Sequence, residues 1–378
     1  MDVTRRGFLE ALGTGAAAAT LPLPLAGKAF AAAKSDSIGQ HVRTDILLNS
    51  NENAYGPSPR VLKALRDGVS EAHRYPDKAR KELPEKIAKL HHVSADQVLI
   101  GCGSVEILRV AAQAFTGPGR KLVMASPTFE VPGRFSEALG AEVVRVPLNR
   151  DFAHDLPAML AAMGNDTGLV YLCNPNNPTA SITPRREIEA FIAKMPAQTF
   201  LLVDEAYHHF ATESHDYVSF LDRPASNDRV LVARTFSKVY GLAGMRLGYG
   251  IGSLPLVERM RKLASPENGN IAVMLAAMVA LDDHPGTMES VRRNAAVRDE
   301  FMRQAHQRKL APIACHANFA MMDVSRPVPG VIDYFKKQGV LVGRAFPPLD
   351  THLRVSFGRP PEMVEFWRAF DRLPPRTG

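Results

Sequence analysis

Between residues 98 and 252 the sequence repeats a short apolar run, a polar or glycine-rich turn and a helix-like segment. The apolar runs predict strands at Val98–Ile100, Lys121–Ala125, Glu142–Val146, Leu169–Cys173, Phe200–Val203, Val230–Ala233 and Leu247–Gly252. Strands separated by helices are joined by right-handed crossovers, which favour a parallel sheet with helices on both faces. We therefore predict an α/β fold whose large domain has a mostly parallel sheet flanked by helices.

The pattern changes after residue 254, and 378 residues exceed the length at which one hydrophobic core usually keeps growing. Two helical stretches, roughly Leu256–Leu263 and Ala272–Arg308, precede a mixture of short strands and helices. We predict that an N-terminal arm (32–65) leads into the large domain (66–255), and that residues 256–378 form a smaller α+β domain.

The first 31 residues differ from the rest. Thr4–Leu9 (TRRGFL) carries a twin-arginine pattern, an alanine-rich stretch follows, and Ala29–Ala31 provides a small-residue cleavage site. An amphipathic helix or a membrane anchor is the alternative, but one glutamate and two prolines interrupt an apolar run that is too weak to span a bilayer. We predict a twin-arginine signal peptide over 1–31, export to the periplasm or the cell exterior, and no membrane association after cleavage.

Charge and cysteine content exclude several classes of protein. The net charge of +7 is spread along the chain and forms no basic–aromatic module of the kind that binds nucleic acid, so we expect no nucleic-acid partner. Cys102, Cys173 and Cys315 are too few for a disulfide scaffold and have no metal-ligand spacing. We expect no metal site, and we interpret the three cysteines as small buried apolar residues.

The stretch 234–246 (RTFSKVYGLAGMR) places a lysine on the loop after a predicted strand. Thr235, Ser237 and Arg246 supply hydroxyl and cationic partners for a phosphate, and Lys238 among them would form a Schiff base with a phosphorylated aldehyde. A surface lysine in an ordinary loop is the alternative for this stretch alone. The other strand ends decide between the two, because ligands of such folds bind at the carboxyl ends of the strands.

A second phosphate-binding element is predicted earlier in the chain. Gly101–Ser104 (GCGS) links a strand to the start of a helix, so Gly103, Ser104 and Val105 would present free backbone N–H groups at the positive end of the helix dipole. A plain tight turn would also explain the glycines. In the first interpretation this turn completes a phosphate cup with Ser237 and Arg246.

Four further residues at strand ends fit a planar ring that contains nitrogen. Asp204 would pair with the ring nitrogen, Asn177 and Tyr207 would bind a ring hydroxyl, and Phe129 would stack on the ring face. Each has a structural alternative: a helix N-cap, a turn-former, a packing tyrosine and a core aromatic residue, respectively. Their shared position at strand ends is stronger evidence than any one of them. Together with Lys238 they predict a pyridoxal 5′-phosphate site.

Taken in order, Asn174–Thr179 (NPNNPT), Asp204–Tyr207 (DEAY), Thr235–Lys238 (TFSK) and Arg246 resemble the class I/II aminotransferases of fold type I, which use pyridoxal phosphate. The histidinol-phosphate aminotransferase-like branch is similar through four further motifs: LNSNEN (Leu48–Asn53), YGP (Tyr55–Pro57), YPD (Tyr75–Asp77) and LRVS (Leu353–Ser356). The resemblance covers nearly the whole chain after the signal and implies an aspartate aminotransferase-like fold.

The resemblance implies a role for each matching residue. Lys238 would hold the cofactor and shuttle a proton, with Asp204 and Tyr207 as its catalytic partners. Arg354 would bind the substrate α-carboxylate through its planar fork, with Tyr55 and Asn177 on the substrate side. The phosphate cup would consist of Gly103, Ser104, Val105, Thr235, Ser237 and Arg246. Tyr75 would reach the phosphate in the neighbouring subunit, which implies a homodimer.

Departures from the family pattern concern the substrate side. Phe129 stands where tyrosine is common, Ala180 stands where glycine is usual, and Gly343–Arg344 shifts an arginine that relatives have nearby. The cofactor residues are intact, whereas the side-chain specificity is left open.

We predict an aminotransferase that moves an amino group from an amino acid, or a similar amine, to a 2-oxo acid. A pyridoxal-phosphate oxidase, cyclase or lyase is the alternative within the same cofactor class, and a binding protein without turnover is the alternative from another class. The complete set of Lys238, Asp204 and Arg246 argues against a binding protein, which has no need of a reactive lysine. The predicted signal peptide argues against histidine biosynthesis, which is cytosolic.

Overall fold

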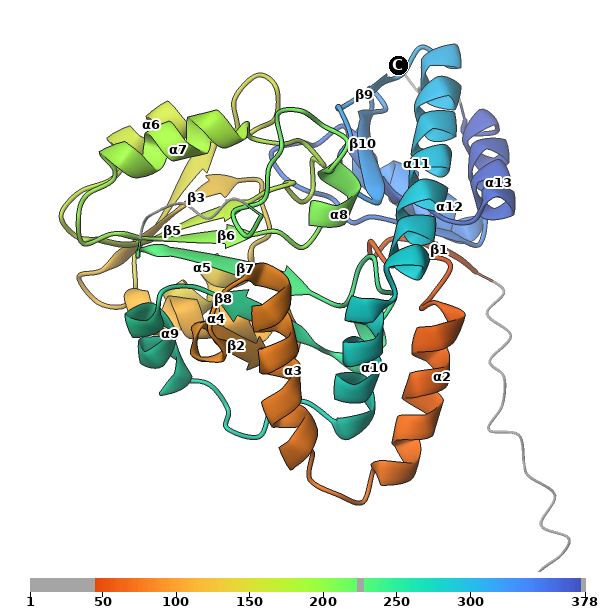
Figure 1. Cartoon of the computed structure of the whole chain (residues 1–378). Helices are drawn as coiled ribbons and strands as arrows, with labels where there is room; N and C mark the ends of the chain where they lie inside the picture. Colours follow the sequence, from red (N-terminus) through yellow and green to blue (C-terminus); the bar gives the residue numbers. More distant parts are fainter. Residues whose placement is uncertain (1–44, 223–227, 375–378) are drawn as a thin grey trace, which may run out of the picture. The chain divides into compact units, whose positions relative to one another are not determined.

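A seven-stranded sheet of order β2-β8-β7-β6-β5-β3-β4 lies at the centre of the computed structural model, which describes residues 45–222 and 228–374 (Figure 1). The strands β2 to β7 are parallel to one another, and β8 is antiparallel to both of its neighbours. This confirms the predicted mostly parallel sheet. The strands are β2 (Val98–Gly101), β3 (Lys121–Ser126), β4 (Val143–Pro147), β5 (Thr167–Cys173), β6 (Phe200–Asp204), β7 (Val230–Thr235) and β8 (Gly248–Ile251).

Helices cover both faces of this sheet, as the alternation of its side chains requires. Leu202 on β6 packs in one apolar cluster with α4 and α9, whereas its neighbours Leu201 and Val203 pack in a second cluster with α3, α7 and α10. Because both faces are buried, the parallel strands are apolar almost throughout. The helices are α3 (Asp77–His91), α4 (Ser104–Phe115), α5 (Val131–Ala138), α6 (Leu156–Ala161), α7 (Arg185–Lys194), α8 (His208–Ala211) and α9 (Leu254–Arg261).

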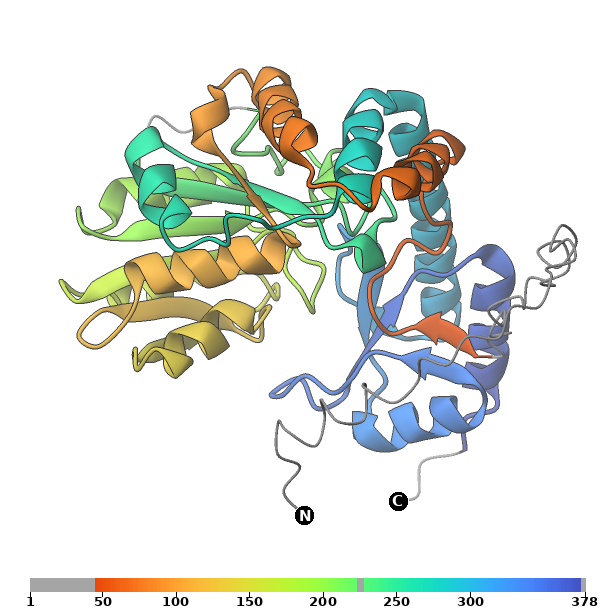
Figure 2. The same cartoon turned by 90° about the horizontal axis from the view of Figure 1, so that it is seen from below.

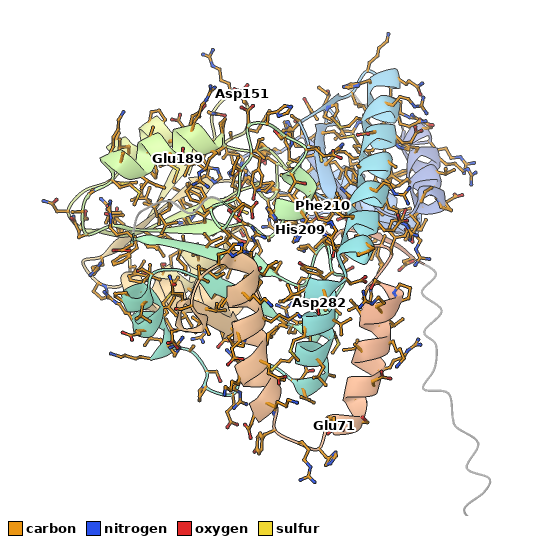
Figure 3. The ribbon with its side chains drawn as sticks, viewed as in Figure 1. Glu71, Asp151, Glu189, His209, Phe210 and Asp282 are labelled. Atoms are coloured by element: carbon orange, nitrogen blue, oxygen red, sulfur yellow. The ribbon has the colours of Figure 1, made fainter. Side chains whose placement is uncertain are left out.

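A second group of strands and helices follows the central sheet (Figure 2). It contains an antiparallel sheet of order β12-β10-β9 and a parallel pair in which β1, from the N-terminal arm, lies beside β11. Phe210 on α8 packs into its core with Val297 and Phe301 of α11 (Figure 3). The elements are β1 (Ile46–Leu48), β9 (Ala311–Pro312), β10 (Phe319–Asp323), β11 (Val340–Val342), β12 (His352–Ser356), α12 (Val328–Lys337) and α13 (Pro360–Asp371). The predicted domain boundary at residue 255 stays a prediction.

The single helix predicted over Ala272–Arg308 is wrong, because the chain forms two helices there, α10 (Ile271–Asp282) and α11 (His284–Gln307). Asp283 lies between them with a non-helical backbone, and its carboxylate accepts hydrogen bonds from Ser58 and from Arg60. Ser58 caps α2 (Pro59–Gly68) by accepting a hydrogen bond from the N–H of Val61. The break therefore joins α10, α11 and α2 at one point.

The next predictions concern the N-terminal residues and membrane-spanning helices. The predicted signal peptide (1–31) and the start of the predicted arm lie outside the described residues. Within residues 45–222 and 228–374, none of the helices combines the length and the apolar character that crossing a membrane requires.

Candidate active site

One cavity of about 790 Å³ opens at the carboxyl ends of the central strands. It lies where the parallel strands of an α/β sheet leave room for a ligand, and its volume is in the range of small-molecule sites. Most of the residues predicted for the site line it: Ser104, Val105, Phe129, Asn177, Asp204, Tyr207, Thr235, Ser237, Lys238, Arg246 and Arg354.

Lys238 reaches into this cavity from the loop that follows β7. Its Nζ donates a hydrogen bond to the backbone oxygen of Asn51 at 3.0 Å and lies 5.5 Å from the centre of the Tyr207 ring. Burial, aided by the positive charge of Arg354, lowers the pKa of Lys238 from 10.5 to about 8. Near neutral pH the side chain therefore has an appreciable neutral fraction, and a neutral amine is the form that attacks a carbonyl carbon.

Asp204 ends β6 and is buried beneath the cavity floor. Its Oδ2 accepts a hydrogen bond from the hydroxyl of Tyr171 at 3.0 Å, and its Oδ1 accepts one from the N–H of Ala206 at 3.1 Å. Burial raises the pKa of Asp204 to about 6, although these hydrogen bonds lower it. A cation placed against this carboxylate would restore its ionised form, so the pocket floor suits a protonated ring nitrogen.

The end of the cavity that is predicted to take a phosphate is built around Arg246. Its Nη1 donates to Ser237 Oγ at 3.3 Å, and Ser237 Oγ also accepts a hydrogen bond from Thr235 Oγ1 at 2.9 Å. Gly103 precedes the first residue of α4 with a φ of +73°, and it caps that helix without any side-chain hydrogen bond. A Cβ at Gly103 would overlap Nη2 of Arg246. Glycine at this position therefore lets a guanidinium and the open N-terminus of a helix face the same anion.

The opposite end of the cavity holds Arg354, which β12 brings next to Asn177. Arg354 Nη1 donates to Asn177 Oδ1 at 2.7 Å, and Nη2 donates to the backbone oxygen of Asn49 at 2.7 Å. Its buried Nε has no hydrogen-bond partner among the described residues. Burial lowers the pKa of Arg354 to about 10, so the group stays charged at neutral pH. A buried guanidinium with a donor to spare fits a substrate carboxylate.

Tyr207 links the two ends. Its hydroxyl accepts a hydrogen bond from Asn51 Nδ2 at 3.1 Å and one from Asn177 Nδ2 at 3.4 Å. Burial raises the pKa of this tyrosine, so its phenol remains protonated and can donate to a ring hydroxyl or its anion. Phe129 lines the wall of the same cavity, where its prediction as a stacking residue requires it.

Three predicted residues do not line the cavity within this subunit. Gly103 lies behind Arg246, as described above. Tyr55 packs against Arg293 and Arg359, with its ring centre 4.9 and 5.9 Å from their guanidinium carbons, and its predicted substrate contact stays a prediction. Tyr75 lies on the loop before α3 and is 76% exposed, which leaves its predicted contact with a neighbouring subunit as a prediction.

Cys102 corrects another expectation. Cys173 and Cys315 are buried as predicted, but Cys102 is exposed. It is the first residue after β2, where the apolar strand has already ended.

Among the described residues, no three His, Cys, Asp or Glu side chains are grouped so that they can hold a metal ion.

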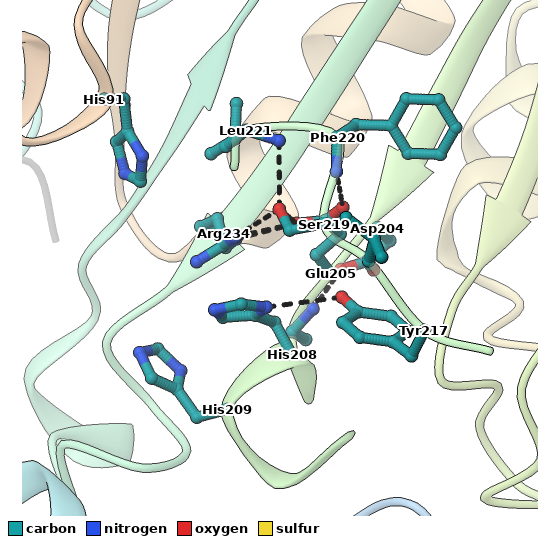
Figure 4. A network of polar contacts seen from close by, with 12 residues as sticks. His91, Asp204, Glu205, His208, His209, Tyr217, Ser219, Phe220, Leu221 and Arg234 are labelled. Atoms are coloured by element: carbon teal, nitrogen blue, oxygen red, sulfur yellow. Dashed lines mark hydrogen bonds and ion pairs between the residues drawn. The ribbon is translucent and has the colours of Figure 1, made fainter. Parts of the chain in front are cut away.

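A buried ion pair between Glu205, which follows β6, and Arg234 on β7 connects the ends of these two strands (Figure 4). The Nε and Nη2 atoms of Arg234 each lie 2.9 Å from Glu205 Oε2, and Ser219 Oγ donates a hydrogen bond to the same oxygen at 2.6 Å. The N–H of Phe220 donates to Glu205 Oε1 at 2.8 Å. Every oxygen of this carboxylate is thus occupied, as a buried charge requires. The network fixes the ends of β6 and β7 relative to the loop that holds residues 219–221.

Sequence reasoning missed two residues that shape the site. Asn51 is a hub: besides the contacts with Lys238 and Tyr207, its side-chain oxygen accepts from Ser356 Oγ at 3.0 Å and its backbone oxygen accepts from Asn318 Nδ2 at 3.0 Å. Asn51 has a φ of +53°, a left-handed backbone conformation that asparagine adopts more readily than most residues. Tyr171, whose hydroxyl donates to Asp204, was missed because it lies inside an apolar strand. Its side chain is on the same face of that strand as Cys173, two residues later, and this was the only sequence signal that it faces the site.

The comparisons with known proteins agree with this geometry. The profile of the family described as aminotransferase class I and II matches residues 43–370. This chain belongs to that family. A histidinol-phosphate aminotransferase from Symbiobacterium thermophilum is 37% identical over 331 residues, which cover 86% of this chain and 89% of the relative.

Two solved structures of similar proteins have the same fold as this aminotransferase. A putative histidinol-phosphate aminotransferase from Erwinia carotovora atroseptica superposes with a TM-score of 0.82 at 32% identity, covering 86% of this chain and 94% of the other. A histidinol-phosphate aminotransferase from Sinorhizobium meliloti, solved in complex with pyridoxal-5′-phosphate, has a TM-score of 0.79 at 28% identity and covers 86% and 89% of the two chains. The predicted aspartate aminotransferase-like fold, the aminotransferase class and its cofactor are confirmed at the level of the family.

Proposed function

We propose that this protein is an exported, homodimeric aminotransferase that takes the amino group from an amino acid whose α-carboxylate binds Arg354. The observation that carries the proposal is the single cavity that Lys238, the buried carboxylate of Asp204, Arg246 with its cup, and the buried guanidinium of Arg354 line together. Family membership supports the reaction class, and the cavity supports the type of substrate.

Pyridoxal phosphate, when bound, draws electrons from the bonds of the substrate α-carbon. The residues of this chain supply the rest. Asp204 would keep a proton on the ring nitrogen, and the cup around Arg246 would hold the phosphate against the N-terminus of α4. Arg354 would fix the carboxylate so that the Cα–H bond faces Lys238, whose lowered pKa suits both uptake and release of that proton.

Histidinol phosphate is a second candidate donor, because relatives 37% identical to this chain carry that name. It lacks an α-carboxylate, so Arg354 would have to bind its phosphate instead. The predicted signal peptide favours an amino acid, since histidine biosynthesis is cytosolic.

A substrate screen tests the proposal. Purified protein loaded with cofactor is mixed with single amino acids and with histidinol phosphate, and the absorbance change of the cofactor reports amino transfer to it; adding a 2-oxo acid restores the starting spectrum. Release of peroxide or ammonia in place of that recovery would support an oxidase or lyase. No spectral change with any amine would support a binding protein.

Lys238→Ala checks the assignment of the lysine. The variant should lose the cofactor that borohydride fixes to the wild-type chain, and amino transfer should fall by about 10²–10⁴-fold or more. If a fixed adduct persisted on the variant, another lysine would have the role.

Export rests on the twin-arginine pattern in Thr4–Leu9. A reporter that fluoresces after folding in the cytosol, fused behind residues 1–31, should reach the periplasm. Replacing Arg5 and Arg6 together by lysine should hold it in the cytosol. Equal export of both fusions would contradict a twin-arginine signal.

A further inference from the structure

The hydroxyl of Tyr171 is a polar group within an apolar part of the core. Tyr171 lies on β5 and is fully buried, in the apolar cluster that also contains Ile107, Met124 and Leu202. A buried hydroxyl without a partner costs free energy, so a tyrosine at this position needs an acceptor, whereas a phenylalanine would not. The acceptor is Asp204, whose Oδ2 lies 3.0 Å from the hydroxyl.

The register of the central sheet brings this hydroxyl to Asp204. Tyr171 on β5 lies opposite Leu202 on the parallel strand β6, two residues before Asp204. Because side chains alternate along a strand, Leu202 and Asp204 point to the same face of the sheet as Tyr171. The long phenol of Tyr171 therefore has to span only one side-chain position along that face to reach the carboxylate.

The two oxygens of the Asp204 carboxylate have donors from different elements. Tyr171 donates to Oδ2 from the neighbouring strand, and the N–H of Ala206 donates to Oδ1 from the turn after β6. Two such donors fix the plane of the carboxylate, which lines the cavity. Each oxygen can accept a second hydrogen bond, so the fixed carboxylate still has an acceptor for a ligand in the cavity.

A donor to Asp204 also favours the ionised form of its carboxyl group. Burial raises the pKa of Asp204 to about 6, and the hydrogen bond from Tyr171 comes first among the contacts that lower it. A hydrogen bond to a charged group changes an ionisation equilibrium by about tenfold or more. Without the hydroxyl, Asp204 would therefore take up a proton about one pH unit higher, near neutral pH, and would lose the charge that a protonated ring nitrogen needs.

We propose that Tyr171 is a positioning residue that acts through Asp204: its hydroxyl keeps the carboxylate ionised and oriented, so that the ring nitrogen of bound pyridoxal phosphate keeps its proton. Within the described part of the chain, Tyr171 itself does not line the cavity. The inference rests on the proposed function for the pairing of Asp204 with the ring nitrogen, and it does not depend on which amine is the donor.

The other titratable groups around Asp204 are common to all the proteins that the test compares. They are Lys238, Glu205, Tyr207 and Cys173. The charge of Lys238 lowers the pKa of Asp204, whereas that of Glu205 raises it. The thiol of Cys173 also lies beside the Tyr171 hydroxyl, but burial raises the pKa of this thiol far above neutral pH, so the thiol has no charge to change. A pH-dependent effect of removing the hydroxyl therefore reports on Asp204.

The test compares two variants that each lose one buried hydroxyl. Tyr171→Phe keeps the ring that fills the core. Tyr249→Phe is the matched control, because Tyr249 is also buried in the central sheet, its hydroxyl lies 3.0 Å from His91 Nε2, and it does not line the cavity. Equilibrium dialysis of the cofactor-free proteins at pH 5.5 and pH 8.5 gives their affinities for pyridoxal phosphate. The same measurement with the analogue in which a carbon replaces the ring nitrogen isolates the contact with Asp204.

We expect Tyr171→Phe to bind pyridoxal phosphate about fivefold to tenfold more weakly than the wild type at pH 5.5, because more of its Asp204 must then lose a proton on binding. At pH 8.5, where Asp204 is ionised in both proteins, the affinities should be equal. The carbon analogue should bind the wild type and Tyr171→Phe equally at each pH. Tyr249→Phe should bind both ligands as the wild type does.

A loss in Tyr171→Phe that was equal at the two pH values, or equal for the two ligands, would show a structural role and overturn the proposal. An unchanged affinity for pyridoxal phosphate at pH 5.5 would overturn it too. Binding is measured without an amino donor, so a wild type that bound the cofactor and transferred no amino group would refute the proposed function and still let the dialysis decide this inference.

Discussion

Asp204 combines a catalytic requirement with a cost to the fold. The carboxylate is buried and accepts hydrogen bonds from Tyr171 and Ala206, and it forms no salt bridge with any of the described residues, although the charge of Lys238 in the same cavity acts to lower its pKa. Burial raises its pKa to about 6 in the folded chain, against 3.8 for an unperturbed group. Functional groups of this kind are retained because the bound ligand, and not the protein, supplies the partner charge.

We predict that Asp204→Asn stabilises the protein without cofactor at pH 8 while it slows amino transfer at least 100-fold. Between pH 4 and pH 6 the Asp204 carboxyl keeps its proton in the folded chain, whereas in the unfolded chain it has lost that proton. The stability that this one group contributes therefore falls by roughly 3 kcal/mol as the pH rises through this window. Asparagine has no such titration. Thermal unfolding of both proteins at pH 5 and pH 8 measures the effect.

The comparison has an internal control. At pH 8 the bound cofactor should bring the wild type back toward or above the variant, because the ring nitrogen then pairs with the carboxylate. A difference in stability between the wild type and Asp204→Asn that was the same at pH 5 and pH 8 without cofactor would contradict the raised pKa, because the buried histidines with lowered pKa values are common to both proteins.

The proposed anion site at the N-terminus of helix α4 depends on the residue before the helix. Gly103 and Gly119 have the same φ of +73°, but a Cβ at Gly103 would overlap Arg246, whereas a Cβ at Gly119 would meet no heavy atom within 4 Å beyond its chain neighbours. Replacing either by alanine should cost about 1–2 kcal/mol of stability from the left-handed backbone alone. We predict that Gly103→Ala also weakens cofactor binding by about 10–100-fold, since it displaces a charged donor, whereas Gly119→Ala leaves the affinity unchanged.

Fluorescence titration of the two proteins with pyridoxal phosphate gives the affinities. Equal affinities would mean that Arg246 does not depend on its position against Gly103.

The ends of β6 and β7 are held by the buried pair of Glu205 and Arg234. Glu205→Gln leaves the Arg234 charge buried without a counter-charge, so we predict a loss of about 3–5 kcal/mol in the free energy of unfolding. Glu137→Gln breaks a half-exposed pair with Arg145 and should cost no more than about 1 kcal/mol. Urea unfolding of both variants checks this, and similar losses would show that burial does not decide the strength of these pairs.

The predicted dimer places Tyr75 of one chain in the site of the other, and testing this contact needs two different variants in one dimer. If Tyr75 completes the site of the neighbouring subunit, a mixed dimer of Lys238→Ala and Tyr75→Ala chains contains one site with both residues intact. We predict that unfolding and refolding the two variants together restores up to about a quarter of the wild-type activity at limiting cofactor, because about half of the dimers are mixed and each has one intact site. Refolding each variant alone is the control.

Activity that stayed at the level of the separate variants would contradict a shared site. A protein that sedimented as a monomer would remove the basis of the experiment.

Local patterns in the sequence were enough to predict the strands of the central sheet and to place at their ends candidate site residues, most of which line one cavity. Periodicity and turn residues act over a few positions, and the carboxyl ends of parallel strands must meet at one edge whatever the rest of the chain does. The same reasoning failed at Asp283, because it overlooked Pro285, which marks the first turn of α11 as a new helix start. The contacts of Asp283 with Ser58 and Arg60, by contrast, are not visible in any local pattern.

Tertiary structure decided which distant residues complete the site. The pairing of β12 with β10 carries Arg354 to Asn177, and the arm that forms β1 carries the Asn51 carbonyl to Lys238. Glu130 and Arg344 are more than 200 positions apart and meet only across the cavity mouth. Such contacts follow from the packing of whole elements and not from any local pattern, so the sequence determined the chemistry of the cofactor site while the folded chain decided how a substrate meets it.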